Sequence, residues 1–237
     1  MFKNLTKTVA FAIVLSFSSL SNAAIITGEV PSVYGNPTFG GSGIPNDQIT
    51  YMDFGNYLLG IAITPRFSSA PVTNVGSSYF AETGVSTTPP DRSTWNFSFF
   101  AAINPLAQFT SFADAGLTSL SLMYDMDSGA GTDFGVWDFS ALLGLSILPV
   151  IEGSQNSTFG FLSVDDANLG GSGTSITAPT GGSVFSPFAS GNYEFKWVAN
   201  GNDAVSVDVT VSVPEPSTIA IMLMSILGLI GARKLRK

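Results

Sequence analysis

The strongest constraint on the fold is a strict alternation near the C-terminus. Valine occupies every second position from Val205 to Val213, and serine, aspartate or threonine fills each position between them. Successive side chains of a strand point to opposite faces, so the pattern predicts a strand with one buried and one solvated face. Residues 193–198 show a similar alternation of aromatic with charged residues, and Asn200 and Gly201 lie between the two runs. Together they predict a β-hairpin.

Short apolar or alternating runs separated by Gly, Pro, Asn and Ser continue through the chain from residue 24 to residue 212. This pattern predicts an all-β body, a single β-sandwich of jelly-roll or Ig-like type. Residues 137–148 are apolar enough for a buried strand, although residues 141–145 could equally start a helix. Other expected strands or apolar runs are residues 25–30, 51–54, 57–63, 72–80, 95–103, 119–125 and 159–164.

The N-terminus has the features of a secretory signal peptide over residues 1–23. Lys3 and Lys7 precede an apolar core at residues 9–17, and small residues precede a cleavage position between Ala23 and Ala24. Such a segment is read by the secretion translocon and signal peptidase. An uncleaved anchor is the alternative, but the apolar core is short for a membrane span.

Three signals follow one another at the C-terminus, over residues 213–237. The run Val213, Pro214, Glu215 and Pro216 holds the backbone extended, because proline stops regular structure. An uncharged apolar stretch, residues 218–232, predicts a transmembrane helix of about 22 Å, short against about 30 Å of hydrocarbon. A basic tail, which predicts a cytoplasmic end, consists of Arg233, Lys234, Arg236 and Lys237.

This order of signals resembles the PEP-CTERM sorting signal of exopolysaccharide-producing Gram-negative bacteria. The resemblance implies that an exosortase, a membrane-embedded cysteine protease or transpeptidase, recognises Val213 to Pro216. It also implies residence in the inner membrane before processing, and then at the cell surface or in the exopolysaccharide matrix. It covers only about a tenth of the chain, and an ordinary C-terminal anchor behind a proline-rich hinge is the alternative.

The residue inventory excludes much chemistry. The chain has no cysteine and no histidine, so disulfides, His-dependent or Cys-dependent nucleophiles and thiolate or imidazole metal sites cannot form. With both ends set aside, sixteen carboxylates face only Arg66, Arg92 and Lys196, a net charge of about −13. Such a body repels nucleic acid and anionic lipid.

One acidic turn is a candidate calcium site. Asp125, Asp127 and Asp133, with Gly129 and Thr132, offer oxygen ligands of the kind that Ca²⁺ prefers. In the other interpretation these aspartates cap turns by bonding their own backbone. We expect no other cofactor.

Two further hypotheses concern carbohydrate. The three tryptophans, Trp95, Trp137 and Trp197, and the six tyrosines could form a face on which sugars stack, or they could be core. Two carboxylates could support glycoside hydrolysis, but Glu29, Glu82, Glu152 and Glu194 show no local motif. We therefore expect a non-catalytic exported protein, structural or adhesive. A carbohydrate- or calcium-binding module is the alternative, and a carboxylate-based glycan-active enzyme ranks behind it.

Overall fold

The computed structural model describes most of the predicted body. The described residues are 24–41, 44, 47–66, 71–87, 91–129, 131–146, 149–182 and 184–214. The predicted signal helix with Ala23, the predicted transmembrane helix, Glu215, Pro216 and the basic tail lie outside these residues. Within the described part of the chain, no helix is both long and apolar enough to cross a bilayer.

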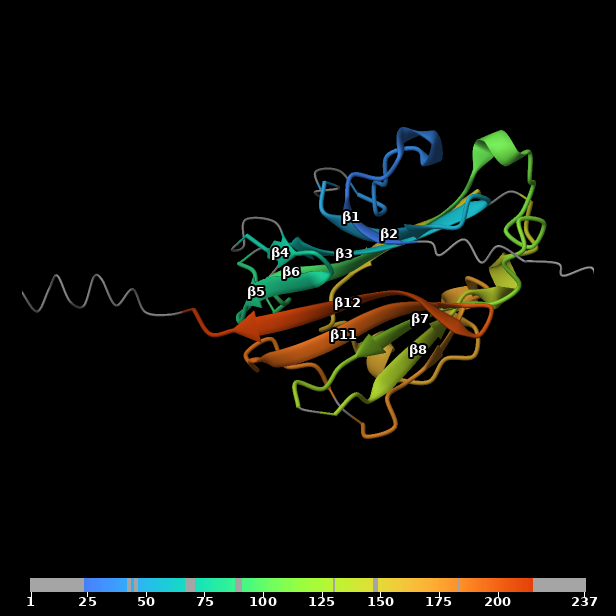
Figure 1. The fold of residues 1–237 in the computed structure, drawn as a ribbon. Coiled ribbons are helices and arrows are strands. Elements are labelled where there is room, and N and C mark those ends of the chain that lie inside the picture. Colours follow the sequence, from blue (N-terminus) through green and yellow to red (C-terminus); the bar gives the residue numbers. More distant parts are fainter. Residues whose placement is uncertain are drawn as a thin grey trace, which may run out of the picture.

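Two packed β-sheets make up the body, as the sequence predicts (Figure 1). The five-stranded sheet has the order β1-β2-β3-β6-β9, and all its neighbours are antiparallel. Its strands are β1 (Ile25–Gly28), β2 (Ile49–Asp53), β3 (Tyr57–Pro65), β6 (Trp95–Ile103) and β9 (Val150–Gln155).

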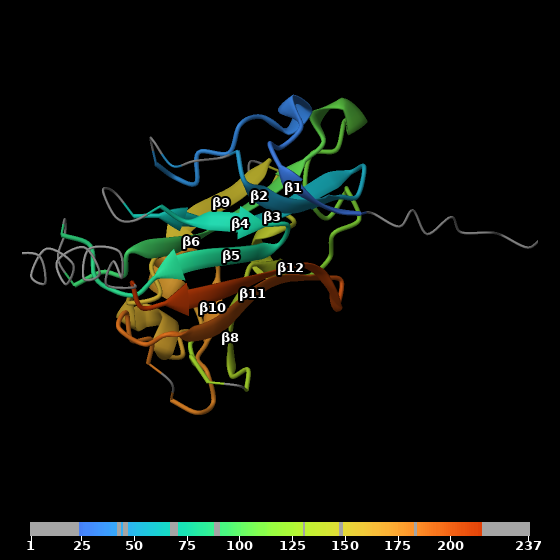
Figure 2. The ribbon, with the colours of Figure 1, turned by 60° about the vertical axis from the view of Figure 1, so that its left-hand side comes forward.

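The seven-stranded sheet has the order β10-β8-β7-β11-β12-β5-β4. Its neighbours are antiparallel except for β12 and β5, which run parallel. Its strands are β4 (Thr73–Val75), β5 (Ser78–Glu82), β7 (Leu120–Asp125), β8 (Phe134–Asp138), β10 (Ser175–Thr177), β11 (Gly191–Ala199) and β12 (Asn202–Ser212). Figure 2 shows β5 lying beside β12, and β4 forms the edge of the sheet beyond β5.

Short 3₁₀ helices are the only helices among the described residues. They are η1 (Ser32–Tyr34), η2 (Pro105–Ala107), η3 (Ser140–Leu142), η4 (Gly160–Ser163) and η5 (Leu169–Gly171). None exceeds four residues, so the sheets carry the architecture.

The predicted C-terminal hairpin is confirmed as β11 and β12. Asn200 and Gly201 both have positive φ, 51° and 76°, which suits the tight turn that joins twisted strands. Val205, Val207 and Val209 are fully buried. The valine face of β12 therefore packs into the core, as its alternation predicts.

Aromatic side chains from both sheets fill the core between them. Phe97 of β6 stacks on Phe195 of β11 with ring centroids 4.9 Å apart. Trp197 of β11 meets Phe99 edge to face at 5.8 Å, and its indole N–H donates to the Gly60 carbonyl of β3 at 3.0 Å. That hydrogen bond joins the two sheets directly.

A second, smaller core covers the outer face of the five-stranded sheet. Phe39, 2% exposed, belongs to this cluster with residues of β2, β3 and β6. Glu152 of β9 holds the covering loop: its carboxylate accepts hydrogen bonds from the backbone N–H of Thr38 at 2.9 Å and of Phe39 at 3.0 Å. This loop lies above β1 and β2 in Figure 1.

The structure corrects three predicted stretches. Residues 72–80 form a hairpin, β4 and β5, because Gly76 turns the chain with φ 59°. The strand expected at 137–148 ends at Asp138. The Asp138 carboxylate accepts a hydrogen bond from the Ser140 N–H at 2.8 Å, and η3 begins at Ser140. Residues 159–164 contain η4 and no strand.

Strand β9 was not predicted from the sequence. Its residues 150–155 have weak alternation, and glycine, here Gly153, ordinarily weakens the interior of a strand. A Cβ at position 153 would lie 2.7 Å from Cζ of Phe99 on β6. The glycine is therefore required by the aromatic ring beside it.

We expect Trp197→Phe to lower the free energy of unfolding by about 2 kcal/mol, because the buried Gly60 carbonyl loses its donor and the smaller ring leaves a void. Chemical denaturation measures this change. Val75→Ala, at a side chain that is 75% exposed, is the control and should change stability by less than about 0.5 kcal/mol. Equal, small effects of the two substitutions would contradict the role assigned to the bond between the sheets.

Candidate functional site

Strand β12 leads directly into the segment that carries the sorting motif predicted from the sequence. Ser212, the last residue of β12, accepts a hydrogen bond from the Thr83 N–H at 2.9 Å. Val213 and Pro214 follow outside any strand, and Val213 is 60% exposed. Because β12 has β11 on one side and β5 on the other, the chain leaves the body from a strand that is held on both edges.

The hypothesis that the tryptophans and tyrosines form a sugar-stacking face is wrong. All three tryptophans and all six tyrosines are at most 7% exposed. Trp95, for example, is enclosed by Phe185, Tyr193 and Phe195 with centroids 5.4 to 6.1 Å away. These rings are core, and none offers a face to a polysaccharide.

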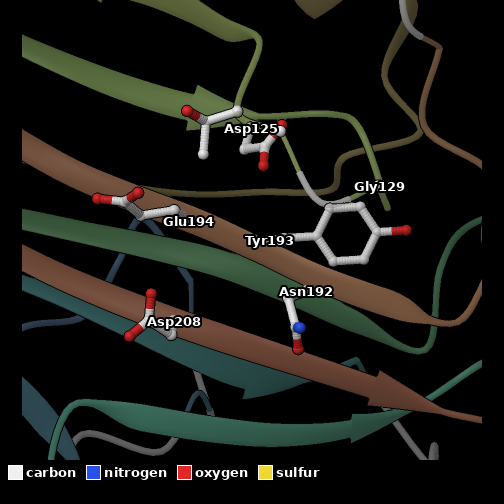
Figure 3. A pocket seen from close by; sticks show the side chains of 8 residues that line it. Asp125, Gly129, Asn192, Tyr193, Glu194 and Asp208 are labelled. Atoms are coloured by element: carbon white, nitrogen blue, oxygen red, sulfur yellow. The ribbon is translucent and has the colours of Figure 1, made fainter.

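An acidic hollow of about 160 Å³ lies on the outer side of the seven-stranded sheet. Figure 3 shows three carboxylates spread over three neighbouring strands, Asp125 on β7, Glu194 on β11 and Asp208 on β12. Glu194 and Asp208 are direct cross-strand partners. The other lining residues are Gly129, Gly131, Thr132, Asn192 and Tyr193.

The three aspartates of the calcium hypothesis do not share this hollow. Asp125 and Asp127 accept the backbone N–H groups two residues ahead of them, both at 2.9 Å. Asp133 instead holds the loop at Thr180, accepting its backbone N–H and its hydroxyl, each at 2.9 Å. These bonds match the turn-capping interpretation.

No group of three acidic, histidine or cysteine side chains that could hold a metal ion occurs among the described residues. The calcium hypothesis remains a prediction. The structure brings Glu194 and Asp208 to Asp125, a pairing that we did not identify from the sequence.

Electrostatics at the hollow oppose ionisation of Asp125. Burial raises the pKa of its carboxyl, and the nearby negative charges of Asp127 and Glu194 raise it further, against the lowering effect of two backbone N–H donors. The pKa of Asp133 is lowered, first by the Gly181 N–H and then by the Thr180 hydroxyl. The hollow is thus a place where negative charge is concentrated and partly desolvated.

We expect Glu194→Gln to raise the free energy of unfolding at pH 7 by about 0.5 kcal/mol, because it removes a like charge beside Asp125 and Asp208. The raised pKa of Asp125 means that the folded protein keeps a proton after the unfolded chain has released it. Stability therefore falls as pH rises through that range, and the gain from the substitution should vanish below about pH 3.

Denaturation of both proteins at the two pH values measures this difference. The glutamine can still accept from Ser206, which donates to Glu194 at 3.0 Å. Glu29→Gln, at an exposed residue, is the matched control. A loss of stability at pH 7 in Glu194→Gln would contradict the repulsion.

Millimolar calcium should leave the melting temperature of the protein unchanged, since the turn aspartates already bond backbone donors. Thermal melts with calcium and with chelator check this expectation. A rise in melting temperature that Asp125→Asn abolishes would instead establish the calcium site.

The comparison with known proteins identifies the C-terminus. A PEP-CTERM protein-sorting motif matches residues 212–237. No curated protein and no solved structure shows a significant match to the chain. The matched span begins at Ser212, where β12 ends, and such a motif implies an exported protein that exosortase processes and that is sorted to the cell envelope. The chain therefore carries a PEP-CTERM sorting signal attached to an all-β body of two packed sheets.

Proposed function

We propose that this protein is a non-catalytic structural or adhesive component of the cell surface or exopolysaccharide matrix. In this proposal the signal peptide is removed after Ala23, and exosortase acts on the tail at residues 213–216. The finer assignment of the body to a jelly-roll or Ig-like sandwich stays a prediction.

The observation that carries the proposal is the coincidence of two boundaries. The sorting motif begins at Ser212, and β12 ends at the same residue. Val213 is mostly exposed, and the buried valines all lie upstream of it. Removal of the tail thus takes no side chain out of the core, so the folded body can be released intact.

The chemistry of the body supports a role without catalysis. Histidine and cysteine are absent, and Glu152, Asp133 and Asp138 accept hydrogen bonds that hold loops. The acidic hollow, at about 160 Å³, is smaller than the roughly 300–1,000 Å³ of ordinary small-molecule sites. These features favour a body that acts through its surface.

Intact-mass and C-terminal peptide mass spectrometry of the protein from its native host tests the proposal, with membrane and culture fluid analysed separately. We expect a mature chain that begins near Ala24 and ends within residues 213–216. Membrane-bound protein that retains Lys237 would show that the tail is a plain anchor.

A matched pair of variants isolates the motif. Pro214→Ala combined with Pro216→Ala should leave the full-length tail in place, while Ser217→Ala should be processed as in the wild type. Both should keep the melting temperature of the body, since these positions follow the last strand. Normal processing of the double variant would contradict recognition at these prolines.

A further inference from the structure

Loops from distant parts of the chain surround the point where the sorting tail leaves the body. Thr83 donates to the Ser212 carbonyl, and the next N–H, of Gly84, donates to Pro187 at 2.7 Å. The Gly84 carbonyl accepts from Thr94 at 3.3 Å, whose own carbonyl accepts from Arg66 at 2.8 Å. The tail therefore emerges through a connected rim at one end of the body.

Three large apolar side chains are exposed on this rim. Val184 is 75% exposed, Phe188 67% and Val213 60%. Phe185 between them is buried and packs edge to face on Trp95 at 5.4 Å. This contact holds the loop on the core, while Val184 and Phe188 on either side of Phe185 stay exposed to solvent.

The rim also holds two of the three basic residues of the body, Arg66 and Arg92. The guanidinium of Arg92 lies 4.7 Å above the ring of Phe159. Burial, and after it the charge of Arg92, lowers the pKa of Arg66, so the two cations lie near each other. The exposed carboxylates of Glu82 and Asp91 balance them. Asp133 also binds the loop that leads to Val184, through Thr180 and Gly181, so basic and acidic groups are mixed at this end of the body.

The predicted membrane segment begins close to this rim. Only residues 215–217 separate Pro214 from the apolar run at 218–232. Even a fully extended chain spans about 14 Å from Pro214 to Thr218. An unprocessed chain would consequently hold the rim next to the bilayer, with the rest of the body beyond it.

We propose that in the unprocessed precursor this exit rim, made of Arg66, Arg92, Val184, Phe188 and Val213, docks on the phospholipid surface of the membrane that holds the tail. The apolar side chains enter the interface, and the guanidinium groups meet lipid phosphates. Repulsion between anionic lipid and the acidic remainder of the body favours the same orientation. The inference rests on the proposed function, because it needs the tail in the membrane before processing.

Docking has a consequence for sorting. It holds Val213 and Pro214 at the membrane surface, where a membrane-embedded processing enzyme would meet them. Few side chains take part, so the contact is weak without the tail. Cleavage would therefore release the body from the membrane.

The absence of cysteine allows a direct test with single labels on the full-length chain in phospholipid vesicles. Ser186→Cys places a fluorophore within the rim, and Ser146→Cys places one on the opposite end of the body; both serines are exposed. With a quencher attached to the lipid headgroups, we expect several-fold stronger quenching at position 186 than at position 146. Flotation of the vesicles reports insertion of the tail separately.

Charged substitutions separate docking from simple tethering. Val184→Asp with Phe188→Asp should reduce quenching at position 186 to the level at position 146. Leu106→Asp with Leu145→Asp, at exposed residues of the opposite end, should leave it unchanged. Melting temperatures confirm that each variant is folded.

Each outcome decides a different claim. Protein that floats with the vesicles but shows equal quenching at both labels overturns the docking and leaves the sorting proposal standing. Docking is likewise overturned if the aspartates leave quenching at position 186 unchanged, since the tether alone then explains it. Protein that does not float overturns both proposals.

Discussion

The structure depends on the burial of one face of β12. Its valines pack into the core, while its backbone pairs with β11 along one edge and with β5 along the other. The chain has no disulfide to close its loops, so this strand joins segments that are far apart in sequence by hydrogen bonds and apolar contact alone. Each buried valine contributes about 1.5–3 kcal/mol relative to exposure. The sorting motif begins at the last residue of this strand.

The β11–β12 hairpin shows which features of the fold the sequence alone predicts. The alternation and the Asn200–Gly201 turn predict both strands and their buried faces. A regular two-residue turn would place Glu194 opposite Val207, a charged residue against a buried one. The structure inserts a register shift between Trp197 and Val198, after which Glu194 faces Asp208. The shift keeps polar residues together on the outer face. The register set by a two-residue turn and the register required by the buried valines therefore disagree by one residue, and this disagreement predicts a β-bulge.

Other features of the fold depend on contacts between residues far apart in the sequence, which no local sequence pattern predicts. The parallel pairing of β5 with β12 and the closure of the outer loop by Glu152 join residues that no short window includes. Asp138 ends a strand through its own side chain, where an apolar run suggested continuation. The three tryptophans and four of the tyrosines are buried between the two sheets, and Tyr34 and Tyr51 are buried under the loop on the outer face. The phase of each strand decides which face meets which core. For the same reason the acidic hollow could not be assembled from spacing along β7 alone.

The carboxylates of the body fall into two groups: some accept hydrogen bonds from loops, and others lie beside a second negative charge. Glu152 and Asp133 accept two or more hydrogen bonds each, and these bonds position loops. The direct pairing of Glu194 with Asp208 instead sets like charges side by side, which opposes folding. Both lie on the outer face of the seven-stranded sheet, where Asp208 is exposed. A sheet face of this kind could otherwise pack against a second copy, and concentrated negative charge opposes that contact. The exit rim differs in exposing the apolar side chains of Val184, Phe188 and Val213, so the body meets its surroundings with two chemically different surfaces.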